Sequence, residues 1–206
     1  TKAGTALQFD GVNDFVNSGN NPSLNITNEI TIDLWIKTST SGYRHLVSKY
    51  NGWTKAGYLF SINNGKLRFH MSDNSGYTTD ISGYTIVNDS VWHHVAVVRN
   101  ATTGKVYLYV DGELDIQKVD NTGSIGNEVN VYIAMGAGVY INASIDDVRI
   151  YNKALTATEI QQNYYGNITT NGLVSWWKFN EGIGSIAYDS INNNDGTIYR
   201  ASWLNY

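Results

Sequence analysis

The segment 143–166, ASIDDVRIYNKALTATEIQQNYYG, constrains the fold more than any other part of the chain. Its first half alternates as a strand does, with Asp146, Val148 and Ile150 on one face and Asp147, Arg149 and Tyr151 on the other. Thr156, followed three residues later by Glu159, forms a capping box that predicts the start of a short helix. Gly166 and Asn167 can end that helix. The segment therefore predicts a strand, a turn and one helix in succession.

Length and composition limit the number of domains and the kinds of partner that the chain can have. A chain of 206 residues can form one β-sandwich domain. The net charge is −4 and only 16% of the residues are charged, so no basic surface for nucleic acid is expected. The absence of cysteine excludes disulfides. Because the sequence has neither a signal peptide nor a long apolar run, we expect no membrane span and interpret the chain as a mature fragment of a longer protein.

Further strands follow from alternation and from turn residues. Residues 30–37, ITIDLWIK, have the pattern of a half-buried antiparallel strand with Trp35 on the face away from the core. Asn64-Gly65 and Asp111-Gly112 are strong hairpin signals. Residues 91–99, VWHHVAVVR, read as a central buried strand, and we expect residues 75–85 to form a loop.

Four motifs occur in a fixed order: LQFDGVNDFV in residues 7–16, WHHVA in 92–96, YVDG in 109–112 and IDDVRIYN in 145–152. In this order they resemble the laminin G-like modules of the concanavalin A-like lectin/glucanase superfamily, and the resemblance covers residues 3–166. It implies an all-β fold, an antiparallel jelly-roll β-sandwich with one short helix after the IDDVRIYN strand. It also implies an extracellular or cell-surface protein that binds glycan or protein partners.

The resemblance further implies a structural calcium ion between the opening and closing strands. Calcium takes hard oxygen ligands, and the expected ligands are Asp10, Asn13 and Asp146. The alternative is that both aspartates cap turns by accepting hydrogen bonds from backbone N–H groups.

Outward aromatic and cationic side chains are the candidate glycan ligands, because flat rings stack on pyranoses and cationic groups donate to hydroxyls. Alternation selects Trp35, Arg44, Tyr58, His70 and Arg149, and the loop 75–85 adds Tyr77 and Tyr84. Two alternatives stay open: Trp35 can pack structurally against a neighbour such as Arg149, and the two loop tyrosines can tuck into the edge of the sandwich.

Residues 113–117, ELDIQ, resemble the E-x-D-x-E strand of retaining glucanases, but Gln117 stands where the acid/base carboxyl is needed. An amide cannot supply or take that proton, so we expect no enzyme. The expected function is a non-catalytic, carbohydrate-binding module. The alternative is a structural or adhesive repeat that contacts proteins or neighbouring repeats.

The C-terminal segment, residues 168–206, resembles the strands that normally precede the family's first motif. We expect one domain over 1–206, with a main body of 1–167 that this segment completes by permutation or by an offset in a tandem array. Its many large apolar groups, among them Trp176, Trp177 and Phe179, should be buried.

Overall fold

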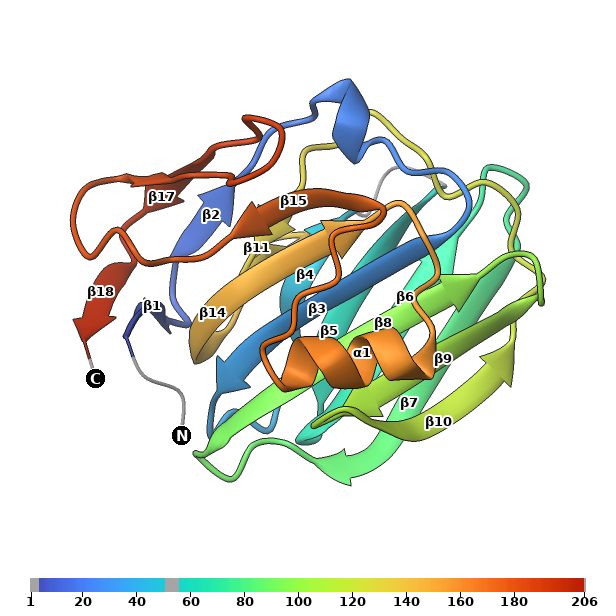
Figure 1. Cartoon of the computed structure of the whole chain (residues 1–206), viewed down its shortest axis with the longest axis horizontal. Helices are drawn as coiled ribbons and strands as arrows, with labels where there is room; N and C mark the ends of the chain where they lie inside the picture. Colours follow the sequence, from blue (N-terminus) through green and yellow to red (C-terminus); the bar gives the residue numbers. More distant parts are fainter. Residues whose placement is uncertain (1–3, 51–55, 206) are drawn as a thin grey trace.

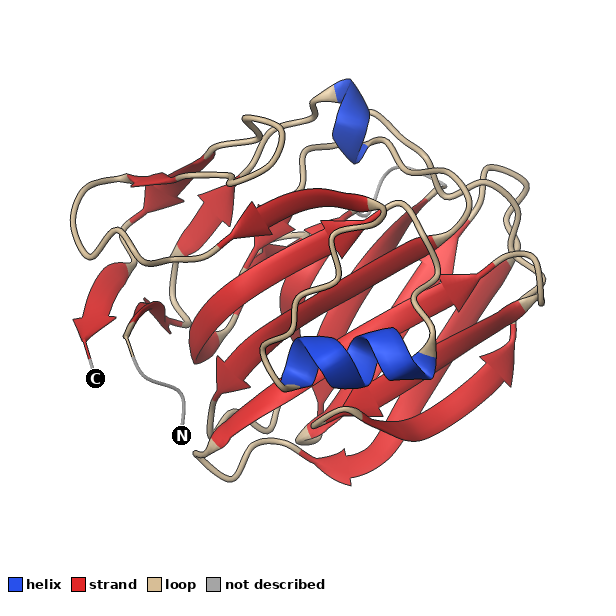
Figure 2. Cartoon of the chain, in the orientation of Figure 1, coloured by secondary structure: helices blue, strands red, loops and turns tan. Residues whose placement is uncertain are grey.

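The computed structural model describes residues 4–50 and 56–205, which form two antiparallel sheets packed face to face with one α-helix on the outside (Figure 2). The expected all-β jelly-roll sandwich is therefore confirmed. Within these residues no helix is long and apolar enough to cross a membrane.

The first sheet, here called sheet A, runs in the order β10-β9-β8-β3-β14-β1-β18, and β15 also pairs with β14. Its strands are β1 Thr5–Asp10, β3 Ile30–Lys37, β8 Trp92–Asn100, β9 Lys105–Val110, β10 Glu113–Val119, β14 Asn142–Tyr151, β15 Leu173–Trp177 and β18 Ser202–Asn205.

The second sheet, sheet B, runs in the order β16-β17-β2-β11-β4-β5-β6-β7. Its strands are β2 Phe15–Asn17, β4 Arg44–Lys49, β5 Gly57–Asn63, β6 Lys66–Ser72, β7 Thr78–Ile86, β11 Tyr132–Ile133, β16 Ile186–Ala187 and β17 Gly196–Tyr199. A small hairpin of β12 Met135–Gly136 and β13 Val139–Tyr140, and the 3-10 helix η1 Pro22–Leu24, complete the described elements.

The core lies between the two sheets and follows the period-2 pattern of the sequence. On β3, Ile30, Ile32, Leu34 and Ile36 are fully buried. Both predicted hairpins are present, with Asn64 and Gly65 at φ 52° and 74°, and Asp111 and Gly112 at φ 52° and 82°. These left-handed angles suit type I′ turns, which match the twist of the flanking strands.

Helix α1, Ala157–Tyr164, lies across the outer face of sheet A (Figure 1). The predicted capping box is present, since Thr156 and Glu159 exchange side-chain and backbone hydrogen bonds. Gly166, at φ 85°, and Asn167 end the helix as expected: their N–H groups donate to the carbonyls of Asn163 and Gln162 at 3.1 and 2.9 Å. A second apolar cluster, which includes Tyr151 and Ile160, fixes the helix on the sheet.

Strand β14 shares one of its edges between two partners. β1 pairs with residues 142–145 and β15 pairs with residues 148–151. Across the other edge, the register with β3 shifts between Asp146 and Arg149, and Asp147 has φ 51°. Because this β-bulge adds a residue, Asp146 does not share a face with Val148; it lies opposite Trp35. The simple alternation predicted for this strand is wrong at Asp146.

The C-terminal segment pairs with the rest of the chain at three places: β15 with β14, β17 with β2, and β18 with β1. Trp177 and Phe179 are fully buried in the main core. That residues 1–206 fold as one independent domain stays a prediction.

Residues 78–86 form edge strand β7, so the prediction of a loop over 75–85 is wrong for most of that segment. Thr79 and Ile81 are buried, whereas Asp80 between them is half-buried and Ser82 is exposed. The Gly- and Ser-rich composition obscured this alternation in the sequence.

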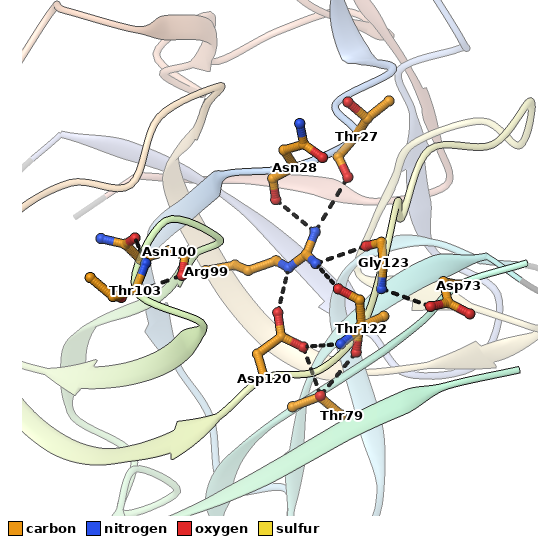
Figure 3. Close-up of polar contacts among 10 residues, drawn as sticks. All are labelled: Thr27, Asn28, Asp73, Thr79, Arg99, Asn100, Thr103, Asp120, Thr122 and Gly123. Atoms are coloured by element: carbon orange, nitrogen blue, oxygen red, sulfur yellow. Dashed lines mark hydrogen bonds and ion pairs between the residues drawn. The ribbon is translucent and has the colours of Figure 1, made fainter. Parts of the chain in front are cut away.

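One end of the sandwich is held by a buried arginine. Figure 3 shows Arg99, at the end of β8, donating to Asp120 and to backbone carbonyls of residues 27, 28, 122 and 123. Its Nε lies 2.8 Å from Asp120, whose second oxygen accepts from Thr79. Every charge here is paired, so the cluster is a structural joint between loops and both sheets.

A candidate binding hollow on the outer face of sheet A

A hollow of about 540 Å³ opens beside the C-terminal end of α1 on the outer face of sheet A. This volume is typical of small-molecule sites. Its lining comes from β3, β8, the β9–β10 turn, β14 and the end of the helix: Trp35, Trp92, Asp111, Asp147, Arg149, Asn163, Tyr164, Tyr165, Gly166 and Ile168. We call this site the sheet A hollow.

Aromatic rings form much of its wall. The Trp35 ring stacks on Tyr164, with centroids 5.7 Å apart and planes 26° apart. Tyr164 is followed by Tyr165, whose ring centroid lies 5.0 Å away and which is 69% exposed. Trp92 adds a fourth, half-buried ring. Side chains of this kind present flat apolar faces with a polar edge.

The bulge in β14 brings a carboxylate to the same place. Asp147 lies on β14 between the residues that pair with β1 and those that pair with β15. Its Oδ1 accepts a hydrogen bond from Trp176 Nε1 at 2.8 Å. Trp176 belongs to β15, so the C-terminal segment orients a carboxylate of the hollow. A left-handed backbone angle at a residue other than glycine is often found at functional sites.

The second carboxylate comes from the β9–β10 turn. Asp111 accepts hydrogen bonds from His94 N–H at 2.9 Å and lies 2.7 Å from His93 Nδ1. A Cβ on the adjacent Gly112 would approach Tyr164 Cδ1 to 3.1 Å. The glycine therefore serves both the turn and the close packing of this ring, and the YVDG motif helps to build the hollow.

A buried polar network supports the floor. Arg149 Nε donates to Asp33 Oδ1 at 2.5 Å, and Asn163 Nδ2 donates to Asp33 Oδ2 at 2.7 Å and to the Tyr151 hydroxyl at 2.9 Å. Burial alone would raise the pKa of Asp33, but the Arg149 guanidinium and His94 overcome burial and lower this pKa to about 2. Asp33 is therefore ionised and Arg149 stays charged, which fixes the helix and the sheet in one arrangement.

Of the sequence-predicted ligand residues, the structure brings Trp35 and Arg149 together in this hollow. Trp35 also packs structurally, since its ring contacts those of Tyr164 and His94. Arg149 lies on the outer face of sheet A, as predicted. It is not exposed there, because α1 and the neighbouring strands bury it completely.

The remaining predicted residues lie elsewhere. Arg44 and His70 are half-buried on sheet B, where His70 Nδ1 lies 3.4 Å from Asp80. Tyr77 and Tyr84 are 64% and 69% exposed, before and on edge strand β7, so they do not tuck into the sandwich.

The prediction that Tyr58 faces outward is wrong, since this side chain is buried in the core with Phe60 and Ile62. All three residues have the same parity along β5, and this signal in the sequence identifies Tyr58 as an inward residue.

The expected calcium ligands do not fit one ion. Asp10 pairs with Asn142, four positions before Asp146 on β14, which separates the two aspartates by roughly 13 Å. Each accepts a local backbone N–H: Asp10 from Val12 at 2.7 Å, and Asp146 from Asp147 at 2.8 Å. Asn13 is half-buried beside Asp14. Within residues 4–50 and 56–205, no three His, Asp or Glu side chains converge in a metal-binding group.

Sequence reasoning did not select Trp92, Asp111, Asp147, Tyr164 or Tyr165, which line the hollow. Tyr164 and Tyr165 end the predicted helix, and the hairpin turn contains Asp111. Each local element was therefore recognisable, but their convergence depends on how α1 docks on sheet A.

Comparison with known proteins places these observations in a family. A family model described as concanavalin A-like lectin/glucanases superfamily matches residues 10–161. Among curated relatives, the non-toxic nonhemagglutinin of Paraclostridium bifermentans is 26% identical over 166 residues, covering 79% of this chain and 14% of that protein. The N,N-dimethylformamidase beta subunit of Paracoccus aminophilus is 24% identical over 204 residues, covering 84% and 27%. The chain thus spans about a quarter or less of these relatives.

Solved structures share the fold. A putative carbohydrate binding protein from Bacteroides ovatus superposes with a TM-score of 0.78 at 15% identity, over 100% of this chain and 60% of that chain. The Ruminococcus gnavus IT-sialidase CBM40 bound to alpha2,3 sialyllactose superposes with a TM-score of 0.65 at 17% identity, over 79% and 97%. Because the family model covers most of the sequence and the fold agrees with it, the chain belongs to the concanavalin A-like lectin/glucanases superfamily, as a laminin G-like module.

Proposed function

We propose that the chain is a non-catalytic carbohydrate-binding module and that the sheet A hollow holds the sugar. The supporting observation is the combination of four aromatic rings with the carboxylates of Asp111 and Asp147 in one hollow. Aromatic faces pack on the apolar face of a sugar ring, and carboxylates accept hydrogen bonds from its hydroxyls. Two structurally similar proteins are described by carbohydrate binding or by a bound sialyllactose, which supports the same class of ligand.

The glucanase-like strand supports a binding role without chemistry. Asp115 accepts the backbone N–H groups of Tyr84 and Thr85 on β7 at 2.9 and 3.1 Å, so it joins the edges of the two sheets. Gln117 cannot act as an acid or base. One relative is named as an enzyme subunit, but this chain covers only 27% of that protein, so its activity is not assigned to this module.

A glycan array followed by calorimetry tests the proposal. Replacing the exposed Tyr165 by Ala should weaken binding of any recognised glycan about tenfold, since ~1.4 kcal/mol of stacking is lost. The matched control is Tyr188→Ala, which removes another exposed tyrosine, 59% exposed, that does not line the hollow and is not among the predicted ligands. Equal affinities for both variants, or no glycan bound by the parent chain, would contradict the proposal.

An adhesive or structural repeat at the cell surface is the alternative expected from the sequence. It makes a different prediction, namely self-association through residues 168–206. Sedimentation of the chain over a range of concentrations measures this association directly. The extracellular or cell-surface location belongs to the same proposal.

A further inference from the structure

A second hollow lies at the end of the sandwich where β3 begins and β14 ends. It consists of two adjoining cavities of about 540 and 400 Å³, which share Asn28, Glu29 and Asn152 in their linings. The rest of the lining comes from residues 22–27 and 101–102. We call this site the end groove. It has no lining residue in common with the sheet A hollow.

The walls of the end groove are held in place by the buried Arg99. One nitrogen of its guanidinium, Nη1, donates to the backbone carbonyls of Thr27 and Asn28 at 3.3 and 2.7 Å. Figure 3 shows these two carbonyls turned toward the guanidinium and the two side chains turned away from it. Glu29 accepts the Thr102 hydroxyl at 2.8 Å and thereby joins one wall to the other. The groove is therefore formed before a ligand arrives, which lowers the entropy cost of binding.

The polar groups of the end groove match sugar hydroxyls. Its exposed polar residues are Thr27, Asn28, Thr102 and Asn152, and Glu29 is half-buried. Within the described part of the chain, the amide side chains of Asn28 and Asn152 make no hydrogen bond. An amide offers both a donor and an acceptor, as a hydroxyl does, so these two groups can pair with hydroxyls of a sugar ring.

The same lining disfavours other classes of ligand. Among the described residues it contains no Lys, Arg or His, so an anion would find no counter-charge. Glu29 supplies the one carboxylate of this lining, whereas a calcium site usually has several. The described lining also lacks aromatic rings, so it offers little to a flat apolar ligand.

We propose that the end groove is a second sugar-binding site, which holds a sugar ring through its hydroxyl groups. This inference rests on the proposed function and adds a site to it. The two sites lie at opposite ends of α1, since Glu29 accepts the Ala154 N–H at 3.4 Å just before the helix, and the sheet A hollow lies at the end of the helix. A module with two sites can hold two branches of one glycan, or two neighbouring glycans, and this strengthens attachment without tighter individual contacts.

An NMR titration of the isotope-labelled full chain with methyl glycosides of glucose, galactose, mannose and N-acetylglucosamine tests the inference. At least one glycoside should shift the side-chain amide signals of Asn28 and Asn152 in a saturable way. Shifts confined to Trp35 and Tyr165 would overturn the inference and leave the proposed function intact. Shifts at neither site would contradict the proposed function as well. If triglycine shifts the two amides and no glycoside does, the groove binds peptide and the inference is wrong.

Variants show whether the two sites act separately. The double variant Asn28→Ala/Asn152→Ala should weaken glycoside binding about tenfold or more, measured at the Thr102 amide, because two hydrogen bonds are lost. The shifts of Tyr165 should stay unchanged. Both asparagines are exposed, so the melting temperature should not change. Asn74→Ala is the matched control, since it removes an exposed asparagine outside both sites. Equal affinities at Thr102 in the double variant and in this control would overturn the inference.

Discussion

Trp176 of β15 donates its indole N–H to Asp147 of β14, with 2.8 Å between Nε1 and Oδ1. The two residues are far apart in sequence, yet β15 continues along the edge of β14 where β1 ends. The C-terminal segment thereby reaches the wall of the sheet A hollow, and the orientation of a candidate ligand group depends on it.

Trp176→Phe should weaken glycan binding about threefold to tenfold. The phenyl ring keeps an aromatic neighbour for Arg149 and Lys178 but cannot donate to Asp147. Loss of a hydrogen bond to a charged group should also cost ~1.5–3 kcal/mol of stability. Trp203→Phe is the control, because it removes another indole donor, 3.0 Å from the Gly184 carbonyl. Unchanged affinity in Trp176→Phe would show that Asp147 does not need this donor.

Asp33→Ala should lower the free energy of unfolding by ~3–5 kcal/mol, since it leaves the buried Arg149 guanidinium without its partner. Denaturant titration measures the loss. In the double variant with Arg149→Ala, part of this loss should be recovered, because both charges are gone. Strictly additive losses would mean that the two side chains do not interact.

Acid should destabilise the module through the same carboxylate. The pKa of Asp33 is lowered in the folded protein from 3.8 to about 2, so its contribution is fully present above about pH 4 and is lost as the pH falls through about 2. The unfolding free energy should drop by ~2 kcal/mol over this range. In Asp33→Asn, the unfolding free energy should depend less on pH over this range.

Asp80 has a pKa lowered to about 2 as well, by hydrogen bonds from His70 and Arg68 that overcome its burial. Its side chain is 37% exposed, so solvent screening should make its contribution smaller. If Asp33→Asn loses the same unfolding free energy in acid as the parent chain, the pH dependence belongs to Asp80 or to other carboxylates.

The sequence predicted those features that depend on local chemistry. The capping box at Thr156, the turn at Asp111 and the inward face of β3 were correct, because each depends on a few neighbouring residues. The prediction that β3 is only half-buried was wrong, since Thr31 and Asp33 on its outer face are also fully buried. The bulge at Asp147 was missed, since polar residues on both sides of it hide the shift in alternation.

The candidate site was only partly predictable for a related reason. Trp35 was selected from strand alternation, whereas Tyr165 and Asp147 become its neighbours through helix docking and strand pairing. The prediction that Asp10 and Asp146 lie side by side was wrong, because the register between β1 and β14 cannot be inferred from two separate sequence motifs.

Calcium binding stays a prediction, although one ion shared by Asp10 and Asp146 does not fit the register. We therefore expect Asp10→Asn not to alter any effect of calcium on Tm. Melting with excess calcium and with excess chelator measures that effect. A common shift in the parent chain and in Asp10→Asn would place calcium elsewhere, and an equal Tm in both buffers would remove calcium as a structural ligand.

Deletion of residues 168–206 should make the remaining chain aggregate or melt well below the full chain. The deletion removes Trp177 and Phe179 from the core and exposes the edges of β1, β2 and β14. Unpaired edges favour association with other chains, and loss of large buried side chains leaves cavities.

The point variant Trp177→Ala separates packing from the deletion itself. It should cost ~3–5 kcal/mol, because the side chain is fully buried and its indole donates to the Asn194 carbonyl at 2.8 Å. Ile183→Ala, in the same segment but 81% exposed, should leave stability within ~0.5 kcal/mol. A truncated chain that is monomeric and as stable as the full chain would show that residues 168–206 belong to another module, and the single-domain prediction would be wrong.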